Sequence, residues 1–165
     1  MGGVRDDARP LAVFDLDGTL ADAGHRQRFL EKGRRDWAAF FSAATDDPPL
    51  AEGVELALAS AGECEVVYLT GRPERCRRDT LDWLESHGLP KGAVHMRRDD
   101  DRRPARHTKL EILERLAGHR DVLFLVDDDE QVCDAAERSG FTVVRARWAA
   151  PSPRMRDAQE REGRT

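Results

Sequence analysis

Residues 11–19 of the chain read LAVFDLDGT, and residues 122–130 read VLFLVDDDE. In each stretch a run of apolar residues leads directly into acidic ones. Near-continuous apolar runs of this length are typical of strands that are buried on both faces of a parallel sheet. Both stretches therefore predict a buried strand that presents carboxylates at its carboxyl end.

Three further apolar runs have the same character, and helical patterns separate most of the five. The runs that we expect to form strands are Leu11–Asp17, Glu65–Thr70, Ala93–Met96, Val122–Asp127 and Thr142–Arg147. The helices that we expect between them are Val54–Ser60, Glu74–His87, Thr108–Ala117 and Glu130–Ser139. Strands that alternate with such helices form βαβ crossovers. The predicted fold is α/β, a doubly wound, Rossmann-like parallel sheet covered on both faces.

One segment departs from this alternation. Between the first strand and residue 54 the chain has two short helical patterns, His25–Lys32 and Asp36–Ala44. We interpret residues 21–52 as a small, cap-like helical insertion over the end of the sheet. An α-hairpin packed on the core fits the same pattern equally well.

The length of 165 residues suits one domain with a single buried core. We place this domain at residues 11–150 and expect residues 1–10 to be a flexible N-terminus. Residues 151–165 are polar and contain two prolines, so we expect a flexible tail there.

The composition excludes several classes of protein. No apolar stretch approaches the ~18–20 residues of a membrane span, and the polar start lacks the apolar core of a signal peptide. The three cysteines, Cys64, Cys76 and Cys133, are odd in number and widely spaced, which argues against a disulfide framework or a zinc site and favours a cytoplasmic protein. A net charge of −5 gives the whole molecule no attraction for nucleic acid, although local basic clusters remain open.

Ligands of an open parallel sheet bind at the carboxyl ends of its strands. The first strand ends in Asp15 and Asp17, the second in Thr70-Gly71-Arg72, and the fourth in Asp127-Asp128-Asp129-Glu130. Lys109 stands at the start of the helix that leads into the fourth strand, and it is one of only three lysines. We expect these groups to converge on one rim.

Each group alone has a simpler explanation. Asp17-Gly18 is a common turn pair, Thr70 can cap a helix, and acids after Val126 favour a helix N-terminus. No such structural explanation accounts for Lys109, because a cation in a first helical turn is disfavoured by a few tenths to ~1 kcal/mol.

Together the carboxylates need a common explanation, because Asp15, Asp17, Asp127 and Asp128 would repel one another at adjacent strand ends. A bound divalent cation or protonation of some members would stabilise them. Oxygen ligands without a nearby Cys or His suit Mg²⁺ better than zinc.

The order DLDGT, YLTGR, Lys109 and VDDD resembles the four motifs of the haloacid dehalogenase (HAD) superfamily of phosphohydrolases, over Leu11–Trp148. A narrower similarity is to the phosphatase domain of phage-type polynucleotide kinases. It rests on FDLDGTLAD, the arginine of TGR, the stretch MRRDDDRRPARHTK, and DDxxQV at Asp127–Val132. The sequence has no GxxxxGK[ST] loop, so any kinase activity is absent or belongs to another chain.

The resemblance implies roles for particular residues. Asp15 would attack phosphorus and form an aspartyl-phosphate, and Asp17 would act as general acid and then as base. That role predicts a pKa of Asp17 raised by its carboxylate neighbours. Thr70 and the Gly71 amide would hold the phosphoryl oxygens, and Lys109 would neutralise developing charge.

The resemblance also implies a metal site. Asp15, the Asp17 carbonyl and Asp127, with help from Asp128, would bind Mg²⁺. An acid two residues after the nucleophile favours phosphoryl transfer over dehalogenation.

The substrate is less well defined by the sequence. A short insertion predicts an open site, which suits a bulky phosphorylated substrate such as a nucleic-acid 3′-phosphate end or a nucleotide. Arg72, Arg97 and Arg98 are candidates for contacts to backbone phosphates, although residues 97–106 also read as a solvated loop of mixed charge.

Several alternatives stay open. Trp37, Phe40 and Phe41 are candidates for stacking on a base, and packing in a core explains them as well. A phosphatase of small molecules (nucleotides or sugar phosphates), a phospho-accepting receiver module and an inactive binding domain are the competing functions. The sequence defines neither an oligomeric state nor a partner enzyme.

Overall fold

The five apolar runs pair in parallel as one sheet, in the order β3-β2-β1-β4-β5. The computed structural model describes residues 8–31, 33 and 35–165. Its strands are β1 (Leu11–Phe14), β2 (Glu65–Pro73), β3 (Val94–Arg97), β4 (Val122–Asp127) and β5 (Val143–Arg145). The predicted α/β fold with a parallel sheet is confirmed.

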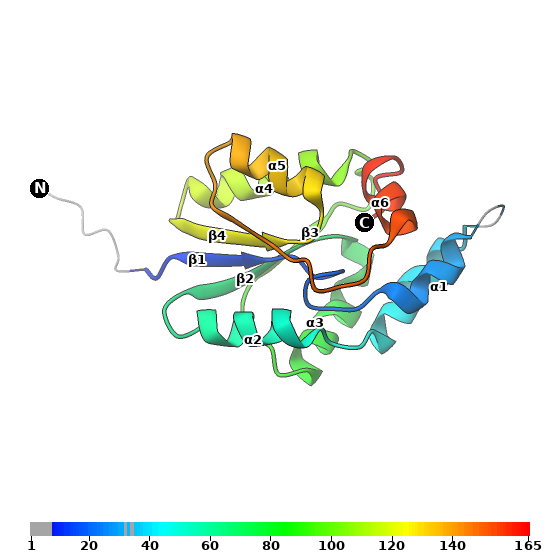
Figure 1. Cartoon of the computed structure of the whole chain (residues 1–165), viewed down its shortest axis with the longest axis horizontal. Coiled ribbons are helices and arrows are strands. Elements are labelled where there is room, and N and C mark those ends of the chain that lie inside the picture. Colours follow the sequence, from blue (N-terminus) through cyan, green and yellow to red (C-terminus); the bar gives the residue numbers. More distant parts are fainter. Residues whose placement is uncertain (1–7, 32, 34) are drawn as a thin grey trace, which may run out of the picture.

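Helices cover both faces of this sheet. The α-helices are α1 (Trp37–Ser42), α2 (Ala51–Ser60), α3 (Arg77–Ser86), α4 (Ala105–Ala117), α5 (Glu130–Arg138) and α6 (Pro153–Glu160). The 3₁₀ helices are η1 (Gly24–Leu30), η2 (Ala43–Asp46) and η3 (Glu74–Cys76). Helices α4 and α5 lie on one face of the sheet, and α2 and α3 lie on the other (Figure 1).

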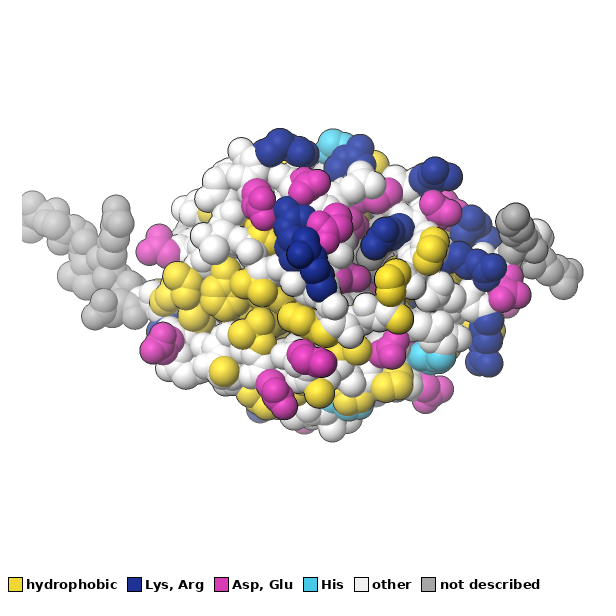
Figure 2. Space-filling model, in the orientation of Figure 1, with side chains coloured by type: hydrophobic (Ala, Val, Ile, Leu, Met, Phe, Trp, Pro, Cys, Tyr) yellow, Lys and Arg dark blue, Asp and Glu magenta, His cyan; other side chains and the backbone are white. Residues whose placement is uncertain are grey.

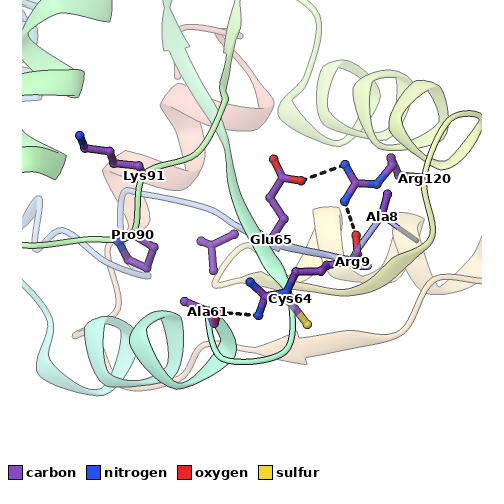
Figure 3. Close-up of a pocket in the computed structure, with 9 residues that line it drawn as sticks. Ala8, Arg9, Ala61, Cys64, Glu65, Pro90, Lys91 and Arg120 are labelled. Carbon is purple, nitrogen blue, oxygen red and sulfur yellow. Dashed lines mark hydrogen bonds and ion pairs between the residues drawn. The ribbon is translucent and has the colours of Figure 1, made fainter. Parts of the chain in front are cut away.

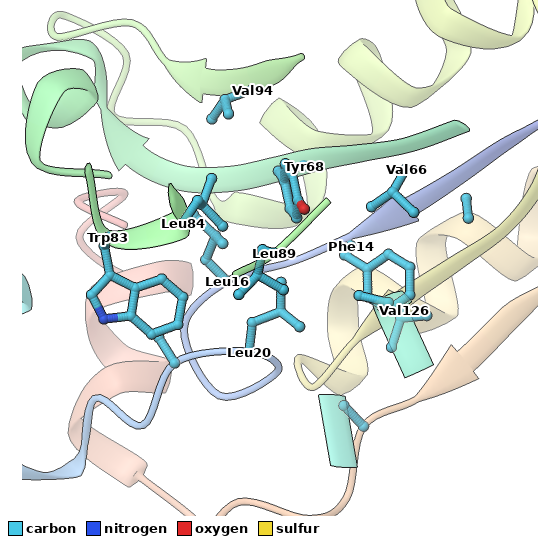
Figure 4. Close-up of a cluster of buried hydrophobic side chains, with 14 of the residues drawn as sticks. Phe14, Leu16, Leu20, Val66, Tyr68, Trp83, Leu84, Leu89, Val94 and Val126 are labelled. Carbon is cyan, nitrogen blue, oxygen red and sulfur yellow. The ribbon is translucent and has the colours of Figure 1, made fainter. Parts of the chain in front are cut away.

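Two apolar layers hold the sheet to its helices. Alternate residues of a strand point to opposite faces, and Phe14 of β1 accordingly packs with Tyr68, Trp83 and Val126 on the side of α2 and α3 (Figure 4). Its neighbour Val13 packs on the opposite side, in the cluster that contains residues of α4 and α5. Burial on both faces explains why the strands read as continuous apolar runs.

The order of the strands determines where a site can form. Strand β1 is paired with β2 on one side and with β4 on the other, so the chain winds in opposite directions from β1. A crevice forms at the carboxyl ends of strands where the winding reverses. The crevice of this sheet lies where Asp15 and Asp127 leave their strands.

Helix α4 begins earlier than the sequence pattern indicated. It starts at Ala105, directly after Pro104, and not at Thr108. Lys109 therefore lies in the second turn of α4, where the helix dipole opposes a cation less than it does in the first. The expectation that Lys109 lies in the first turn of its helix was therefore wrong.

A third apolar cluster joins the insertion to α6. Phe40 and Phe41 are buried there against Met155 and Ala158 of α6. The alternative of core packing is thus the correct one for these two phenylalanines, whereas Trp37 stays half-buried.

The expected flexible tail is wrong for residues 153–160, which form α6. Its first turn is capped, because the Ser152 side chain accepts a hydrogen bond from the Met155 amide at 3.3 Å. Met155 and Ala158, three residues apart, give the helix one apolar face. The expected flexible N-terminus lies mostly outside the described residues.

Among the helices that the structure describes, none has the length and apolar character needed to cross a membrane.

Candidate active site

The strand ends bring one lysine and two aspartates into direct contact. The Lys109 ammonium donates to Asp15 Oδ1 and to Asp127 Oδ2, both at 2.7 Å. All three side chains are almost completely buried. Thr19, which the sequence patterns did not single out, donates from its hydroxyl to Asp15 Oδ2 at 3.0 Å. Asp15 is therefore held in one orientation by two donors.

Asp15, Asp127 and Asp128 form a cluster that fits a divalent cation. One carboxylate oxygen from each residue lies within 4.8 Å of the others. Among the described residues, Asp128 Oδ1 is buried and has no hydrogen-bond partner. An unpartnered buried oxygen beside two more carboxylates is the donor set that Mg²⁺ prefers.

Gly18 forms a wall of this cluster. Its φ of 85° lies in the left-handed region, and a Cβ atom built on it would lie 2.0 Å from Asp128 Oδ2. The glycine of the DLDGT stretch therefore serves both the turn after β1 and the space for Asp128.

Without a cation the cluster carries uncompensated negative charge. Burial and the charge of Asp15 raise the pKa of Asp127 to about 7, although Lys109 acts in the opposite direction. The same two causes raise the pKa of Asp128 well above its usual value. Burial alone would lower the pKa of Lys109, but Asp127 and Asp15 outweigh burial and raise it. One ammonium group thus does not balance three carboxylates, and without a cation Asp127 and Asp128 hold protons more tightly than free carboxylates do.

The side chain of Asp17 points into a separate network of charges. Its Oδ1 accepts hydrogen bonds from Arg72 at 2.6 Å and from Arg26 at 2.7 Å. Both guanidinium groups also contact Asp47, at 3.3 Å and 2.8 Å. All four side chains are buried, so the insertion contributes Arg26 and Asp47 to a network of two arginines and two aspartates, and His25 contacts Asp47 at its edge (2.6 Å).

The expected pKa of Asp17 is therefore wrong in sign. Burial acts to raise the pKa of Asp17, but the charges of Arg72 and Arg26 outweigh burial and lower it. The sequence analysis considered only the neighbouring carboxylates. Arg26 gave no signal of its own, because nothing in a 3₁₀ segment shows that it faces a strand end nine residues earlier.

Two of the three arginines expected to bind substrate are structural. Arg72 belongs to the network with Asp17, and Arg97 donates to backbone carbonyls that include Gly71 (3.0 Å) and Arg103 (2.7 Å). Both are fully buried, so the expected contacts to backbone phosphates are wrong for this conformation. Arg98 is the exposed one, with 79% of its side chain accessible, and it pairs with Asp100.

The site is closed, contrary to the open site that we expected from the short insertion. Asp15 is 2% exposed, Thr70 1% and Lys109 2%. Asp128 is only partly buried and lines a cavity of about 310 Å³ next to α6. Lys and Arg side chains gather around α6 and the insertion, whereas hydrophobic side chains form a band over the sheet (Figure 2). Asp128 can thus be reached from outside, whereas Asp15, Thr70 and Lys109 are covered.

A larger cavity lies at the other end of the sheet. It measures about 520 Å³, and Arg9, Glu65, Lys91 and Arg120 are among its lining residues (Figure 3). Arg120 and Glu65 form an ion pair of 2.8 Å within it. In the described part of the chain, the residues that line this cavity include none of those at the carboxyl ends of the strands.

The substitution Arg26→Gln tests whether the insertion controls Asp17. Because the shorter, uncharged glutamine side chain cannot hold both carboxylates, we expect Asp17 to lose its fixed position and kcat to fall about tenfold to a hundredfold. The pKa of Asp17 should rise, so the pH–rate profile should change shape along with the loss in rate. Arg28→Gln is the matched control, because Arg28 lies on the same 3₁₀ helix and is not one of the four network residues. Equal effects of the two substitutions would contradict this prediction.

Comparisons with known proteins identify similar chains. The model of the polynucleotide kinase PNKP phosphatase domain matches residues 10–148. This confirms the family resemblance drawn from DLDGT, YLTGR, Lys109 and VDDD. A comparison with curated protein sequences gives no match.

Solved structures agree with the family match. A chain in the structure of the Pnkp1/Rnl/Hen1 complex is 24% identical with a TM-score of 0.72, and one in the Pnkp1/Rnl/Hen1 RNA repair complex is 25% identical with a TM-score of 0.70. The matches cover 88% and 92% of this chain but 48% and 47% of those chains, so this chain spans about half of their length. The haloacid dehalogenase-like hydrolase SP0104 from Streptococcus pneumoniae has the same fold, with 13% identity, a TM-score of 0.61 and coverage of 92% and 91%.

Proposed function

The chain belongs to the family of polynucleotide kinase PNKP phosphatase domains, and we propose from this that it is a Mg²⁺-dependent phosphomonoesterase that acts on a nucleic-acid 3′-phosphate end. The observation that carries the proposal is the placement of Lys109 between Asp15 and Asp127, with Asp128 beside them. This arrangement orients one carboxylate as a nucleophile and leaves a donor set for a cation.

We propose a reaction in two steps. In the first, an Asp15 oxygen forms a bond to phosphorus, the bond from phosphorus to the leaving oxygen breaks, and Asp17 supplies a proton to that oxygen. In the second, water attacks the aspartyl-phosphate, the bond to Asp15 breaks, and Asp17 accepts the proton of the water. Lys109 and the amide of Gly71 stabilise the negative charge that develops on the phosphoryl group.

Asp17 must change its protonation state during this cycle. In the closed structure its two arginines stabilise the carboxylate, which makes Asp17 both hard to protonate for the first step and a weak base for the second. For both steps a guanidinium group has to be drawn away. An entering phosphate dianion provides that attraction, since Arg72 is bound to Asp17 and is two residues from Thr70.

Mg²⁺ fits the site by charge and by ligand type. Asp15, Asp127, Asp128 and the Asp17 carbonyl are the groups that would hold it. When bound, it supplies the positive charge that the cluster lacks and polarises a phosphoryl oxygen.

The choice of a nucleic-acid end rests on the family and on its relatives. The matching complex of Pnkp1 is described as an RNA repair complex. A nucleotide or a sugar phosphate is the alternative substrate, and the closed site is compatible with a small molecule. A receiver module is disfavoured, because Lys109 precedes β4 and the acidic pair follows the first strand.

A substrate panel tests the proposal directly. We expect the purified chain with Mg²⁺ to release phosphate from a 3′-phosphorylated oligonucleotide at least about tenfold more efficiently, in kcat/KM, than from a nucleoside 3′-monophosphate or a sugar phosphate. A stacked base and a neighbouring phosphate supply the additional binding energy.

A 5′-phosphorylated oligonucleotide of the same sequence is the control for the position of the phosphate. Preference for sugar phosphates would show a small-molecule phosphatase. Release from no substrate would remove the proposed activity altogether.

A further inference from the structure

The residues that follow α6 cover Gly71 and Asp17 at the carboxyl ends of the strands. Thr165 is only 3% exposed, and its backbone oxygen accepts a hydrogen bond from Arg97 at 3.3 Å. Its hydroxyl lies 3.5 Å from Asp17 Oδ2. A Cβ atom built on Gly71 would lie 2.1 Å from the Thr165 carbonyl carbon. Thr165 therefore occupies the space between Gly71 and Asp17, where a phosphoryl group and its leaving oxygen have to lie.

The preceding residue covers an aromatic surface. The guanidinium carbon of Arg164 lies 5.2 Å from the centre of the Trp37 ring. Trp37 in turn stacks on Phe41, with ring centres 6.1 Å apart and planes 27° apart. Arg75 lies over Phe41 at 5.1 Å. Guanidinium and aromatic groups thus form a continuous row that leads away from Thr165.

This row has the chemistry of a surface for single-stranded nucleic acid. An aromatic face accepts any base by stacking, and arginines beside it attract backbone phosphates. The arginines are close enough to repel one another: burial, then the charges of Arg102 and Arg75, lower the pKa of Arg164. The Arg75 guanidinium pairs with Asp99 at the long distance of 3.9 Å. An anion that bound here would relieve this repulsion.

Ion pairs, two apolar side chains and the buried Thr165 hold the covering segment, residues 153–165, in place. Within the described part of the chain, three ion pairs join it to other segments: Arg106–Glu160 (2.5 Å), Arg35–Glu162 (2.7 Å) and Arg154–Glu31 (3.2 Å). All three involve at least one partly exposed side chain, and ion pairs of that kind stabilise a protein little. The residues of the segment that join the third apolar cluster are Met155 and Ala158. Because α6 packs on the insertion and its ion pairs are partly exposed, we expect the segment to be able to leave the surface without unfolding the sheet.

We propose that the covering segment is an intramolecular competitor of the substrate, and that the surface beneath it binds the single-stranded end of a nucleic acid. The terminal phosphate replaces Thr165 beside Gly71, and the adjacent base replaces Arg164 on Trp37. Asp128 already faces a cavity, so a cation would not need this movement to reach it. This inference rests on the proposed phosphatase activity and adds to it a binding surface and a control on access.

Gly163→Ala is the sharpest test of the covering segment. Gly163 has a φ of 57°, and a Cβ atom there would lie 2.0 Å from the carbonyl oxygen of Arg102. One added methyl group therefore forces the segment away without changing any charge. Arg161→Ala is the matched control, because the Arg161 side chain is 81% exposed and pairs with Asp157 of the same segment. Thermal unfolding should show both variants folded.

We expect Gly163→Ala to raise kcat/KM for a 3′-phosphorylated oligonucleotide by about threefold to tenfold, as the loss of a competing closed state implies. The rise for p-nitrophenyl phosphate should be smaller, and Arg161→Ala should match the wild type. In an Asp15→Asn background, Gly163→Ala should tighten binding of the same oligonucleotide in fluorescence anisotropy by the same factor. Unchanged or weaker binding in folded Gly163→Ala protein would overturn the proposal.

Trp37→Leu tests the surface itself. In the Gly163→Ala background it should lower oligonucleotide affinity about tenfold, the effect of one lost base stack. Phosphate release from p-nitrophenyl phosphate should fall less than release from the oligonucleotide. Equal losses would show that Trp37 only supports the insertion, and would refute the surface. An inactive wild type would instead refute the proposed activity, so the two failures are distinct.

Discussion

Asp15→Asn should abolish Mg²⁺-dependent phosphate release, with a fall in kcat of at least about 10⁴-fold, the size of loss typical when a nucleophile is removed. The amide of asparagine has nearly the same shape as the carboxylate, but it is a poor nucleophile and a weaker ligand for a cation. The fold should persist, because the substitution removes one negative charge from a cluster that has only one neighbouring ammonium group in the described structure. The measurement is release of inorganic phosphate from a 3′-phosphorylated oligonucleotide.

The matched control for this variant is Asp121→Asn. Asp121 is an exposed carboxylate immediately before β4, at the opposite end of the sheet from the site. It should retain the full rate. Wild-type protein in excess chelator should behave like Asp15→Asn. Activity of Asp15→Asn close to that of the wild type would show that the nucleophile is another residue.

Lys109→Met should have the second largest effect, on both stability and activity. The Lys109 ammonium is the one cation that contacts Asp15 and Asp127 in the described structure. Methionine has a similar length and is apolar, so its introduction leaves buried carboxylates without a partner. Breaking a buried ion pair in this way costs about 3–5 kcal/mol of unfolding free energy. Phosphate release should fall by about 10³-fold, because the charge on the phosphoryl group is no longer neutralised.

The loss of stability in Lys109→Met should depend on metal and on pH. Mg²⁺ should recover part of it, since the cation takes over the role of the ammonium. The pKa of Asp127 is raised from 3.8 to about 7 in the folded protein, so the folded state binds more protons than the unfolded state between these values. Stability from this group therefore falls as pH rises from about 4 to 7. Without Lys109 the pKa of Asp127 rises further, and the variant should be weakest above that range.

Thermal unfolding in chelator and in Mg²⁺, on the acidic and on the alkaline side of the Asp127 titration, measures these effects. Lys91→Met is the matched control, because Lys91 is exposed and remote from the strand ends. It should show no gain from Mg²⁺ beyond that of the wild type. A Lys109→Met protein with the same stability in all of these conditions would show that the carboxylates do not interact as described.

The parts of the site that the sequence predicts correctly are those fixed by strand ends. Asp15 and Asp127 stand directly after apolar runs. Because β1 and β4 pair in parallel with Phe14 opposite Val126, the two aspartates that follow these residues lie side by side at the same edge of the sheet. The positions of Asp15 and Asp127 therefore follow from the apolar pattern and the parallel topology alone, and no side-chain partner has to be known to predict them.

The parts that the sequence does not reveal depend on partners that lie far along the chain. Arg26 and Asp47 meet Asp17 only because the insertion folds back over the strand end. Arg97 resembles an exposed arginine in a charged loop, but most of its hydrogen bonds go to backbone carbonyls, which carry no signature in a sequence. In the same way, Met155 and Ala158 give too weak a periodic pattern to predict a helix among so many charges.

The network of Arg26, Asp47, Arg72 and Asp17 has a consequence for how this domain can diversify. In an enzyme whose cap is an independent module, selectivity can change by exchange of the cap while the chemistry stays the same. Here residues 21–52 supply Arg26, which lowers the pKa of Asp17, and Asp47, which contacts both arginines of the network. Evolution of the insertion is therefore constrained by catalysis as well as by recognition, and a graft from a relative would have to carry its own counter-charges with it.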